Sequence, residues 1–302
     1  MRWLELSVVA DSEAVEAVSE ILGRVSEGTS VQPTRLITNP NDELAVRDDP
    51  AWPYVVTAHL LDDPASAGAV EATERALWHL QAFGIRPVGE LRVRAVDDAS
   101  WAETWKDHYV PQRIGRLVVV PSWLDEPRRD GEVQIVLDPG MAFGTGLHPT
   151  TRGCLELLQE LDPMPSPVLD VGTGSGILAI AALALGATSA AGIDTDELSV
   201  AASTANAARN GMADRFTAFH GSVEAGPDAA YPLVVANLVA ALLVRLAPQL
   251  AARLAPGGVL IVSGIIEPRA AEVVDAMRGA GLAVAQRRDD GEWVSLRLER
   301  AG

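Results

Sequence analysis

The sequence predicts an α/β protein in which a doubly wound, largely parallel sheet follows a small α+β domain. Three observations support this class. Short apolar runs alternate with helical apolar patterns from residue 131 onward. The apolar run Val168–Val171 leads into three alternate glycines, Gly172, Gly174 and Gly176, and then at once into a helical pattern. The last two apolar runs are separated by the turn Asp-Asp-Gly-Glu, which predicts a hairpin and therefore an antiparallel final strand.

Residues 1–97 are expected to form a ferredoxin-like domain with the order β-α-β-β-α-β. Asp11 and Ser12 are candidate caps for its first helix, and the second helix is expected from Pro64 to about Phe83. This region contains no evident catalytic cluster, so we expect it to recognise a partner or to serve as a scaffold. Its expected strands are residues 2–9, a strand near Val31–Ile37, Tyr54–Leu61 and Leu91–Val96.

Residues 98–130 are expected to connect the two domains. Ser100 is a candidate cap for a short helix that carries Trp101 and Trp105, and the segment Arg-Leu-Val-Val-Val-Pro-Ser-Trp predicts a strand and a turn. Together with Trp123, these tryptophans could stack on nucleic-acid bases. Because few basic residues flank them, packing between domains is the favoured interpretation.

Residues 131–302 are expected to form a Rossmann-like sheet covered by helices on both faces. The expected parallel strands are Val133–Leu137, Val168–Val171, Ala190–Ile193, Phe216–Phe219, Leu233–Ala236 and Val259–Ser263. The expected helices are 150–160, 176–186, 196–210, 239–254 and 268–280, and the final hairpin joins Ala283–Arg288 to Trp293–Leu298.

The glycine turn after Val171 predicts a site for an adenosine-containing cofactor. Glycine permits positive φ and close approach of the backbone to a ligand. Asp194 ends the next apolar run, at the distance expected for a carboxylate that binds ribose hydroxyls. A dinucleotide site calls for the spacing G-x-G-x-x-G, whereas this turn reads G-x-G-x-G. With Asp170 before it, the spacing favours S-adenosyl-L-methionine over NAD and over a purely structural turn.

A second glycine-rich stretch, Leu137–Thr151, reads LDPGMAFGTGLHPTT. It predicts a flexible lid in which Phe143 covers the ligand and a threonine hydroxyl binds the cofactor. The alternative is structural, with Thr150 or Thr151 capping the following helix.

Asn237 follows an apolar strand in the segment Val-Val-Ala-Asn-Leu-Val-Ala. Its side-chain carbonyl would accept a hydrogen bond from a substrate amine and direct the amine toward the methyl donor. A structural alternative is that Asn237 caps the next helix, and one residue can serve both purposes.

Composition narrows the function further. The chain has 302 residues, 24 Lys and Arg against 41 Asp and Glu, and a formal net charge of −17, which disfavours direct binding to nucleic acid and permits a basic protein partner. A single cysteine, Cys154, excludes an internal disulfide and fits a reducing, cytoplasmic location. We expect no membrane span, and the sequence contains no hydrolase nucleophile motif. We also expect no metal site, because the five histidines lack the spacing of metal ligands.

Four segments together resemble the PrmA family, the ribosomal protein L11 methyltransferases. They are LDPGMAFGTGLHPTT, VLDVGTGSGILAIAALALGA, GIDTDELSVAASTANAARNG and VVANLVA. The resemblance is strong from about residue 98 to 302, and the amino-terminal region matches in size and in its opening pattern. It implies a class I methyltransferase sheet and S-adenosylmethionine-dependent N-methylation of lysine ε-amines and the α-amine of a basic large-subunit ribosomal protein.

The resemblance implies cofactor contacts at Thr151, Gly172, Asp194 and Asn237, and we add Gly174 and Gly176 from the turn. Two departures from the pattern stand out. Asn-Leu-Val-Ala replaces the commoner Asn-Ile-Leu-Ala, and Gly221-Ser222-Val223 replaces an acidic residue that many methyltransferases carry after the third strand. Adenine is therefore expected to bind backbone groups near Ser222.

The expected catalytic roles are positional, and they fall to Asn237 and Phe143, since the sequence offers no obvious general base for the amine. Two rival functions remain open at this stage: an RNA methyltransferase with an amino-terminal RNA-binding domain, and a non-catalytic module that binds S-adenosylmethionine. The modified amines, the number of methyl groups, the oligomeric state and any domain movement are not encoded in these motifs.

Overall fold

The computed structural model describes residues 3–26, 29–33, 36–39, 42–48, 54–82, 89–96, 110–138 and 148–300. The chain divides into two units, residues 1–109 and residues 110–302. The expected boundaries at 97 and 130 remain predictions. However, strands β7 (Gln112–Ile114) and β8 (Leu117–Pro121), which lie in the expected connecting region, pair within the second unit.

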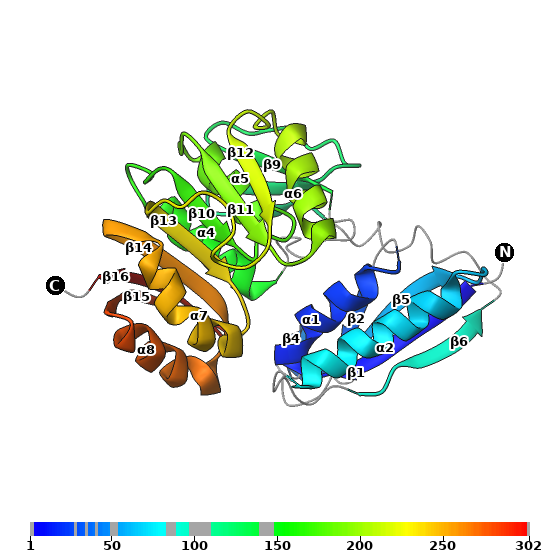
Figure 1. Ribbon diagram of the computed structural model, residues 1–302. Helices are drawn as coiled ribbons and strands as arrows, with labels where there is room; N and C mark the ends of the chain where they lie inside the picture. Colours follow the sequence, from blue (N-terminus) through cyan, green and yellow to red (C-terminus); the bar gives the residue numbers. More distant parts are fainter. Residues whose placement is uncertain are drawn as a thin grey trace. The chain divides into compact units, whose positions relative to one another are not determined.

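The first unit is built on a four-stranded antiparallel sheet with the order β2-β5-β1-β6. Helices α1 and α2 cover one face of this sheet (Figure 1), over buried side chains such as Leu6, Val8 and Val56. The elements are β1 (Trp3–Ala10), α1 (Ser12–Gly23), β2 (Thr29–Pro33), β3 (Leu36–Asn39), β4 (Asp42–Asp48), β5 (Tyr54–Leu61), α2 (Ser66–Ala82) and β6 (Arg92–Val96).

Two details of this unit differ from the expectation. The strand expected near Val31–Ile37 is divided between β2 and β3, and β3 pairs with β4 in a separate two-stranded sheet. Pro33 ends β2, which is consistent with the loss of a backbone donor at proline. Asp11 caps α1, because its Oδ1 accepts the N–H of Ala14 at 3.0 Å, while Ser12 is the first helical residue.

The second unit contains a seven-stranded sheet with the order β12-β11-β10-β13-β14-β16-β15. Its first five strands in this order are parallel, and β16 runs antiparallel to both of its neighbours, as expected for the final strand. The strands are β10 (Val168–Val171), β11 (Ala190–Asp194), β12 (Phe216–His220), β13 (Tyr231–Asn237), β14 (Leu254–Ile266), β15 (Leu282–Asp290) and β16 (Trp293–Arg300).

Helices cover both faces of this sheet (Figure 1), and each face has its own apolar core. Leu155, Ile177 and Leu233 belong to one core, and Leu243, Val273 and Leu296 belong to the other. The helices are α4 (Pro149–Gln159), α5 (Ile177–Ala184), α6 (Glu197–Arg209), α7 (Ala240–Ala252), the short 3-10 helix η2 (Glu267–Arg269) and α8 (Ala270–Gly279).

One predicted strand forms in a different sheet. The segment Val133–Leu137 is β9, but it pairs with β8 in a three-stranded sheet, β7-β8-β9, and not with the main sheet. Its buried side chains Ile135 and Leu137 pack in the same core as α5. Strand pairing depends on the neighbour that is available in space, which the alternation of apolar residues does not specify.

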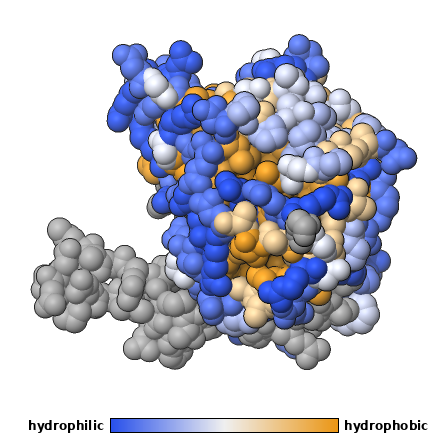
Figure 2. Space-filling view, turned by 90° about the vertical axis from the view of Figure 1, so that its left-hand side faces the viewer, coloured by the Kyte–Doolittle hydropathy of each residue, from blue (hydrophilic) through white to orange (hydrophobic). Residues whose placement is uncertain are grey.

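The edge strand β15 is predominantly exposed and carries charged side chains such as Arg287, Asp289 and Asp290. Charge on an edge strand disfavours pairing with another chain. Figure 2 views the molecule from the side on which β15 and α8 lie in Figure 1 and shows predominantly hydrophilic residues around smaller apolar areas.

In the described part of the chain, no helix combines the length and the apolar character that crossing a bilayer demands.

Candidate active site

The glycine turn lies at the carboxyl end of β10, between this strand and α5. The φ values of Gly172, Gly174 and Gly176 are +72°, +51° and +83°. Residues that carry a Cβ rarely adopt positive φ, so these positions favour glycine. The N–H of Gly172 donates to the carbonyl of Ile193 on β11 at 2.8 Å, which anchors the turn to the neighbouring strand. A Cβ at Gly172 would come within 2.4 Å of Leu238 Cδ2, so the turn is also crowded from the β13 side.

Asp170 supports the turn from beneath. Its side chain is fully buried, and Oδ2 accepts hydrogen bonds from Thr173 Oγ1 at 2.9 Å and from the N–H of Ala179 at 3.2 Å. Burial raises the pKa of Asp170 to about 7, against these two hydrogen bonds, and the nearby charge of Asp194 raises it further. Oδ1 of Asp170 is buried without a hydrogen-bond partner among the described residues.

Asp194 connects the end of β11 to the same turn. Its Oδ2 accepts the N–H of Gly174 at 2.9 Å, and its Oδ1 accepts the N–H of Asp196 at 3.0 Å. Burial raises the pKa of Asp194 above its ordinary value, and the backbone hydrogen bonds oppose this shift. A carboxylate has about four lone-pair sites, so Asp194 retains capacity to accept a ligand hydroxyl.

The loop that contains Ser222 lies beside the end of β11. The N–H of Gly221 donates to the backbone carbonyl of Asp194 at 2.8 Å, and Ser222 itself is exposed. Val223, the next residue, is buried in the core to which α7 also contributes. The expected adenine-binding segment is therefore adjacent to the expected ribose-binding carboxylate.

Asn237 is the last residue of β13, which pairs with β10 in parallel, so it lies at the same sheet edge as the glycine turn. Its Nδ2 donates to Thr150 Oγ1 at 3.1 Å and to Thr151 Oγ1 at 3.3 Å. The side chain is 9% exposed, and Oδ1 is buried with no hydrogen-bond partner within the described part of the chain. The amide is thus oriented by two hydroxyls and presents an unsatisfied acceptor.

The expected capping roles at this site are wrong in two cases. Asn237 does not cap α7, whose N-cap is Val239 and has no side-chain cap. Neither Thr150 nor Thr151 caps α4: the N-cap is His148, and its Nδ1 accepts the N–H of Thr150 at 3.3 Å. Because Pro149 occupies the first helical turn and His148 supplies the cap, both threonine side chains are buried and directed to Asn237.

His148 is itself held by the final hairpin. Its ring lies edge-on to the indole of Trp293 on β16, with centroids 4.7 Å apart and planes at 73°. Gly153, one turn further along α4, packs so closely on β16 that a Cβ would come within 2.1 Å of Ser295 Oγ. The hairpin therefore packs directly against the helix that carries both threonines.

The structure brings most of the predicted site residues to one sheet edge. Asp194 is bonded to the glycine turn, Thr151 is bonded to Asn237, and Ser222 lies in the adjacent loop. Phe143 and the stretch 139–147 lie outside the described residues, as do Trp101 and Trp105. Within the described ranges, no three His, Cys, Asp or Glu side chains gather as metal ligands.

One further residue at this edge is not among the expected site residues, although it lies in one of the four segments that carry the family resemblance. Asn206 on α6 is 1% exposed, and its Nδ2 donates to the carbonyl of Ser175 in the glycine turn at 2.9 Å. A signal for it exists in the sequence, because Ser199, Ser203 and Asn206 place polar side chains on one face of a predicted helix.

A family model described as ribosomal protein L11 methyltransferase (PrmA) matches residues 2–301. The chain belongs to the PrmA family. Among the relatives, a ribosomal protein L11 methyltransferase from Chloroflexus aurantiacus is 42% identical over 321 residues, which covers 97% of each chain. A second one, from Herpetosiphon aurantiacus, is 40% identical and covers 98% of each chain.

A solved structure supports the fold. The ribosomal protein L11 methylase from Lactobacillus delbrueckii subsp. bulgaricus is 36% identical, has a TM-score of 0.59, and covers 64% of this chain and 100% of its own. The α/β methyltransferase fold and the PrmA resemblance are thereby confirmed. The ferredoxin-like assignment of the amino-terminal unit is not established by these comparisons.

Proposed function

We propose that this protein transfers methyl groups from S-adenosyl-L-methionine to lysine ε-amines or the α-amine of ribosomal protein L11. Membership of the PrmA family over residues 2–301 carries the reaction class and the substrate. The buried Asn237 Oδ1, without a hydrogen-bond partner in the described part of the chain and located at the edge that holds the glycine turn, supports a site for an amine at this position.

The residues at this edge suit S-adenosylmethionine. The positive-φ turn lets a ligand approach the backbone at Gly172, Gly174 and Gly176. We assign the ribose hydroxyls to Asp194, whose Oδ2 accepts the N–H of Gly174. We assign Thr151 to the amino-acid part of the cofactor and the backbone near Ser222 to adenine.

The bound cofactor supplies an electrophilic methyl group on its sulfonium, so the protein contributes position more than proton transfer. Asn237 would accept a hydrogen bond from the amine and direct the nitrogen lone pair toward the methyl group. Thr150 and Thr151 accept hydrogen bonds from Nδ2 of the amide, which leaves its oxygen to be presented. Phe143 is proposed to cover the reacting groups.

The amino-terminal unit is proposed to recognise the substrate. Its order β1-α1-β2 and β5-α2-β6, with the sheet order β2-β5-β1-β6, supports a ferredoxin-like arrangement. The formal net charge of −17 would accelerate encounter with a basic ribosomal protein and disfavour nucleic acid. Such a substrate implies that the reaction takes place in the cytoplasm.

Labelled S-adenosylmethionine tests this function. The full-length protein is incubated separately with purified ribosomal protein L11, with the remaining large-subunit proteins and with ribosomal RNA. Label is expected on L11 alone. Label on RNA would instead support the RNA methyltransferase, and tight cofactor binding without any transfer would support a non-catalytic module.

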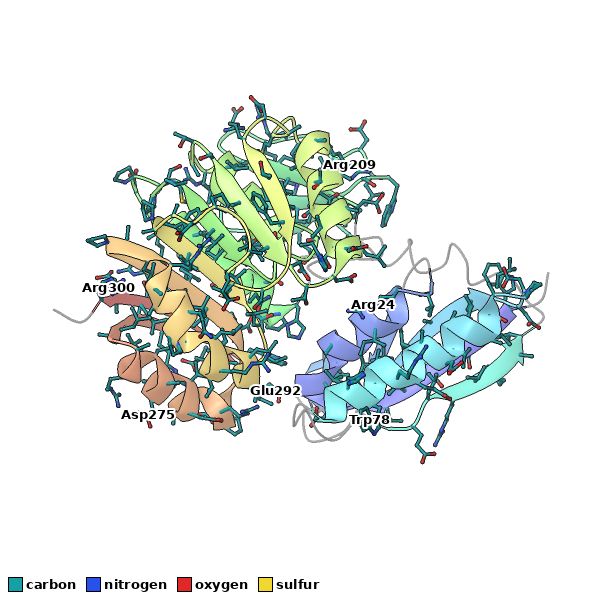
Figure 3. All side chains as sticks on the ribbon, viewed as in Figure 1. Arg24, Trp78, Arg209, Asp275, Glu292 and Arg300 are labelled. Atoms are coloured by element: carbon teal, nitrogen blue, oxygen red, sulfur yellow. The ribbon has the colours of Figure 1, made fainter. Side chains whose placement is uncertain are left out.

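Calorimetry tests the cofactor assignment directly. S-adenosylmethionine is expected to bind and NAD is not. Asp194→Ala should weaken binding by roughly 1.5–3 kcal/mol, because it removes an acceptor for charge-assisted hydrogen bonds. The matched control is Asp275→Ala, since Asp275 is exposed on α8 (Figure 3) and pairs with Arg278. An equal loss of S-adenosylmethionine affinity in the two variants would contradict the proposed role of Asp194.

A further inference from the structure

Helix α6 buries a polar face where a helix of this fold would ordinarily bury an apolar one. Ser199, Ser203 and Asn206 are 1%, 0% and 1% exposed, and they follow one another at spacings of four and three residues. This face meets the glycine turn, because a Cβ at Gly176 would lie 3.0 Å from Ser203 Cβ. Helix α6 also lies against β9, on the side of the sheet that carries α5 (Figure 1).

Asn206 forms hydrogen bonds to two segments that are far apart in the sequence. Its Nδ2 donates to the carbonyl of Ser175 at 2.9 Å, and its Oδ1 accepts the N–H of Asp138 at 3.0 Å. Arg209 Nη1 also donates to this Oδ1 at 2.8 Å. Because one partner is a carbonyl and the others are N–H groups, the orientation of the amide is determined.

The contact to Ser175 holds one peptide plane of the turn. The Ser175 carbonyl shares a peptide plane with the N–H of Gly176, which donates to the carbonyl of Thr173 at 2.7 Å. This plane turns about ψ of Ser175 and φ of Gly176, and the glycine has no side chain that would restrict its φ. The buried amide of Asn206 is the side chain that restrains it from the α6 side.

We propose that Asn206 is a positioning residue for the cofactor, which holds the glycine turn at a fixed place relative to the end of β9 at Asp138. This inference rests on the proposed binding of S-adenosylmethionine at the turn. It assigns a role to α6 beyond packing: its polar face keeps the backbone groups of the turn in the orientation that the cofactor meets.

Asn210, one turn later, provides a matched control. Its Nδ2 donates to the carbonyl of Val136 at 2.7 Å, and its Oδ1 accepts the N–H of Val136 at 2.9 Å. It has the same residue type, is the C-cap of α6 and is also bonded to β9. None of its hydrogen bonds goes to the glycine turn.

The test compares Asn206→Asp, Asn206→Ala and Asn210→Asp in the full-length protein. Asn206→Asp retains an acceptor for Asp138 and loses the donor to Ser175, so the Kd and the KM for S-adenosylmethionine should rise about tenfold. At saturating cofactor, kcat should stay within about twofold of wild type. Asn210→Asp should lower Tm about as much as Asn206→Asp does, but it should leave the Kd for S-adenosylmethionine within about twofold of the wild-type value.

The outcomes separate this inference from the proposed function. Equal cofactor affinity of wild type and Asn206→Asp, or equal weakening by Asn210→Asp, would overturn the positioning role alone. A wild-type protein that binds no S-adenosylmethionine would overturn the proposed function and this inference with it. If Asn206→Asp does not fold, Asn206→Ala is compared with Asn210→Ala by the same Kd and KM measurements and the same criteria.

Discussion

Three side chains at the carboxyl edge of the sheet, two of them buried and that of Asp194 half-buried, are each held by specific hydrogen bonds. Asp170 supports the glycine turn from below, Asp194 links it to β11, and Asn237 presents an acceptor beside it. Buried polar groups that lack a partner are costly, so the oxygens of Asp170 and Asn237 that have no partner among the described residues call for an explanation.

Asn237→Ala should reduce kcat on the order of 10²-fold, by analogy with the loss of one positioned hydrogen-bonding group. The Kd for S-adenosylmethionine should change much less. Asn237→Asp is the comparison, because it retains an oxygen acceptor and should keep more turnover than the alanine variant. Single-turnover rates and Tm, measured on the same preparations, distinguish a positioning role of Asn237 from a structural one. Normal turnover in a destabilised Asn237→Ala protein would leave Asn237 with a structural role only.

Asp170 makes stability depend on pH. Its pKa of about 7 in the folded protein lies above the value in the unfolded chain, so the folded protein holds a proton that the unfolded chain has released between about pH 4 and pH 7. The free energy of unfolding therefore falls as the pH rises through this window. Asp170→Asn should remove this pH-dependent decrease in the free energy of unfolding. The difference between the Tm of the variant and the Tm of wild type should therefore increase from pH 5 to pH 8.

Thermal unfolding at several pH values, with Asp275→Asn as an exposed control, measures the effect of Asp170. The gain is bounded by about 1.4 kcal/mol for each unit of pKa shift. If the difference in Tm between Asp170→Asn and wild type is the same at pH 5 and pH 8, Asp170 does not make stability depend on pH.

At the scale of elements, α4 and the β15–β16 hairpin act together on the site. Gly153 lets α4 approach β16, where Ser295 Oγ lies 2.7 Å from Ser263 Oγ. His148 and the two threonines lie in the first turn of the same helix. A shift of α4 would therefore move them away from Asn237.

Gly153→Ala should destabilise the protein by about 1–3 kcal/mol through overpacking, and it should reduce cofactor affinity as well. The double variant Gly153→Ala with Ser295→Gly removes the clashing side chain and should recover part of both losses. Denaturant unfolding and calorimetry on the single and double variants measure the coupling. Additive losses in the double variant would show that contact with Ser295 is not the cause.

At the scale of the whole molecule, the two units divide the residues of interest unequally. Every described residue of the candidate site lies in residues 110–302, and the amino-terminal unit contributes none of them. The acidic charge of the chain is a further property of the molecule as a whole.

A fragment of residues 110–302 should therefore bind S-adenosylmethionine with a Kd close to that of the full chain. It should methylate intact ribosomal protein L11 poorly, because the proposed recognition unit is missing. Scintillation counting of labelled L11, after both proteins have been matched for cofactor binding, provides the measurement. Full activity of the fragment on intact L11 would exclude a recognition role for residues 1–109.

The sequence by itself determined the class of fold and the place of the glycine turn. Three alternate glycines after an apolar strand constrain the backbone locally, and the strands of the main sheet appear where alternation and apolar runs predict them. Asp194 is identifiable for the same reason, since its position follows from the length of one strand-helix-strand unit.

Tertiary structure alone decided the contacts between segments distant in the sequence. The separate sheet of β9, the capping of α4 by His148 and the bond from Asn206 to Ser175 each depend on which surfaces meet. A local pattern specifies which face of an element is buried, but it does not specify the neighbour that buries it. For that reason Asn237 could be placed at a strand end from the sequence, while its threonine partners emerged only from the packing of α4 on the sheet.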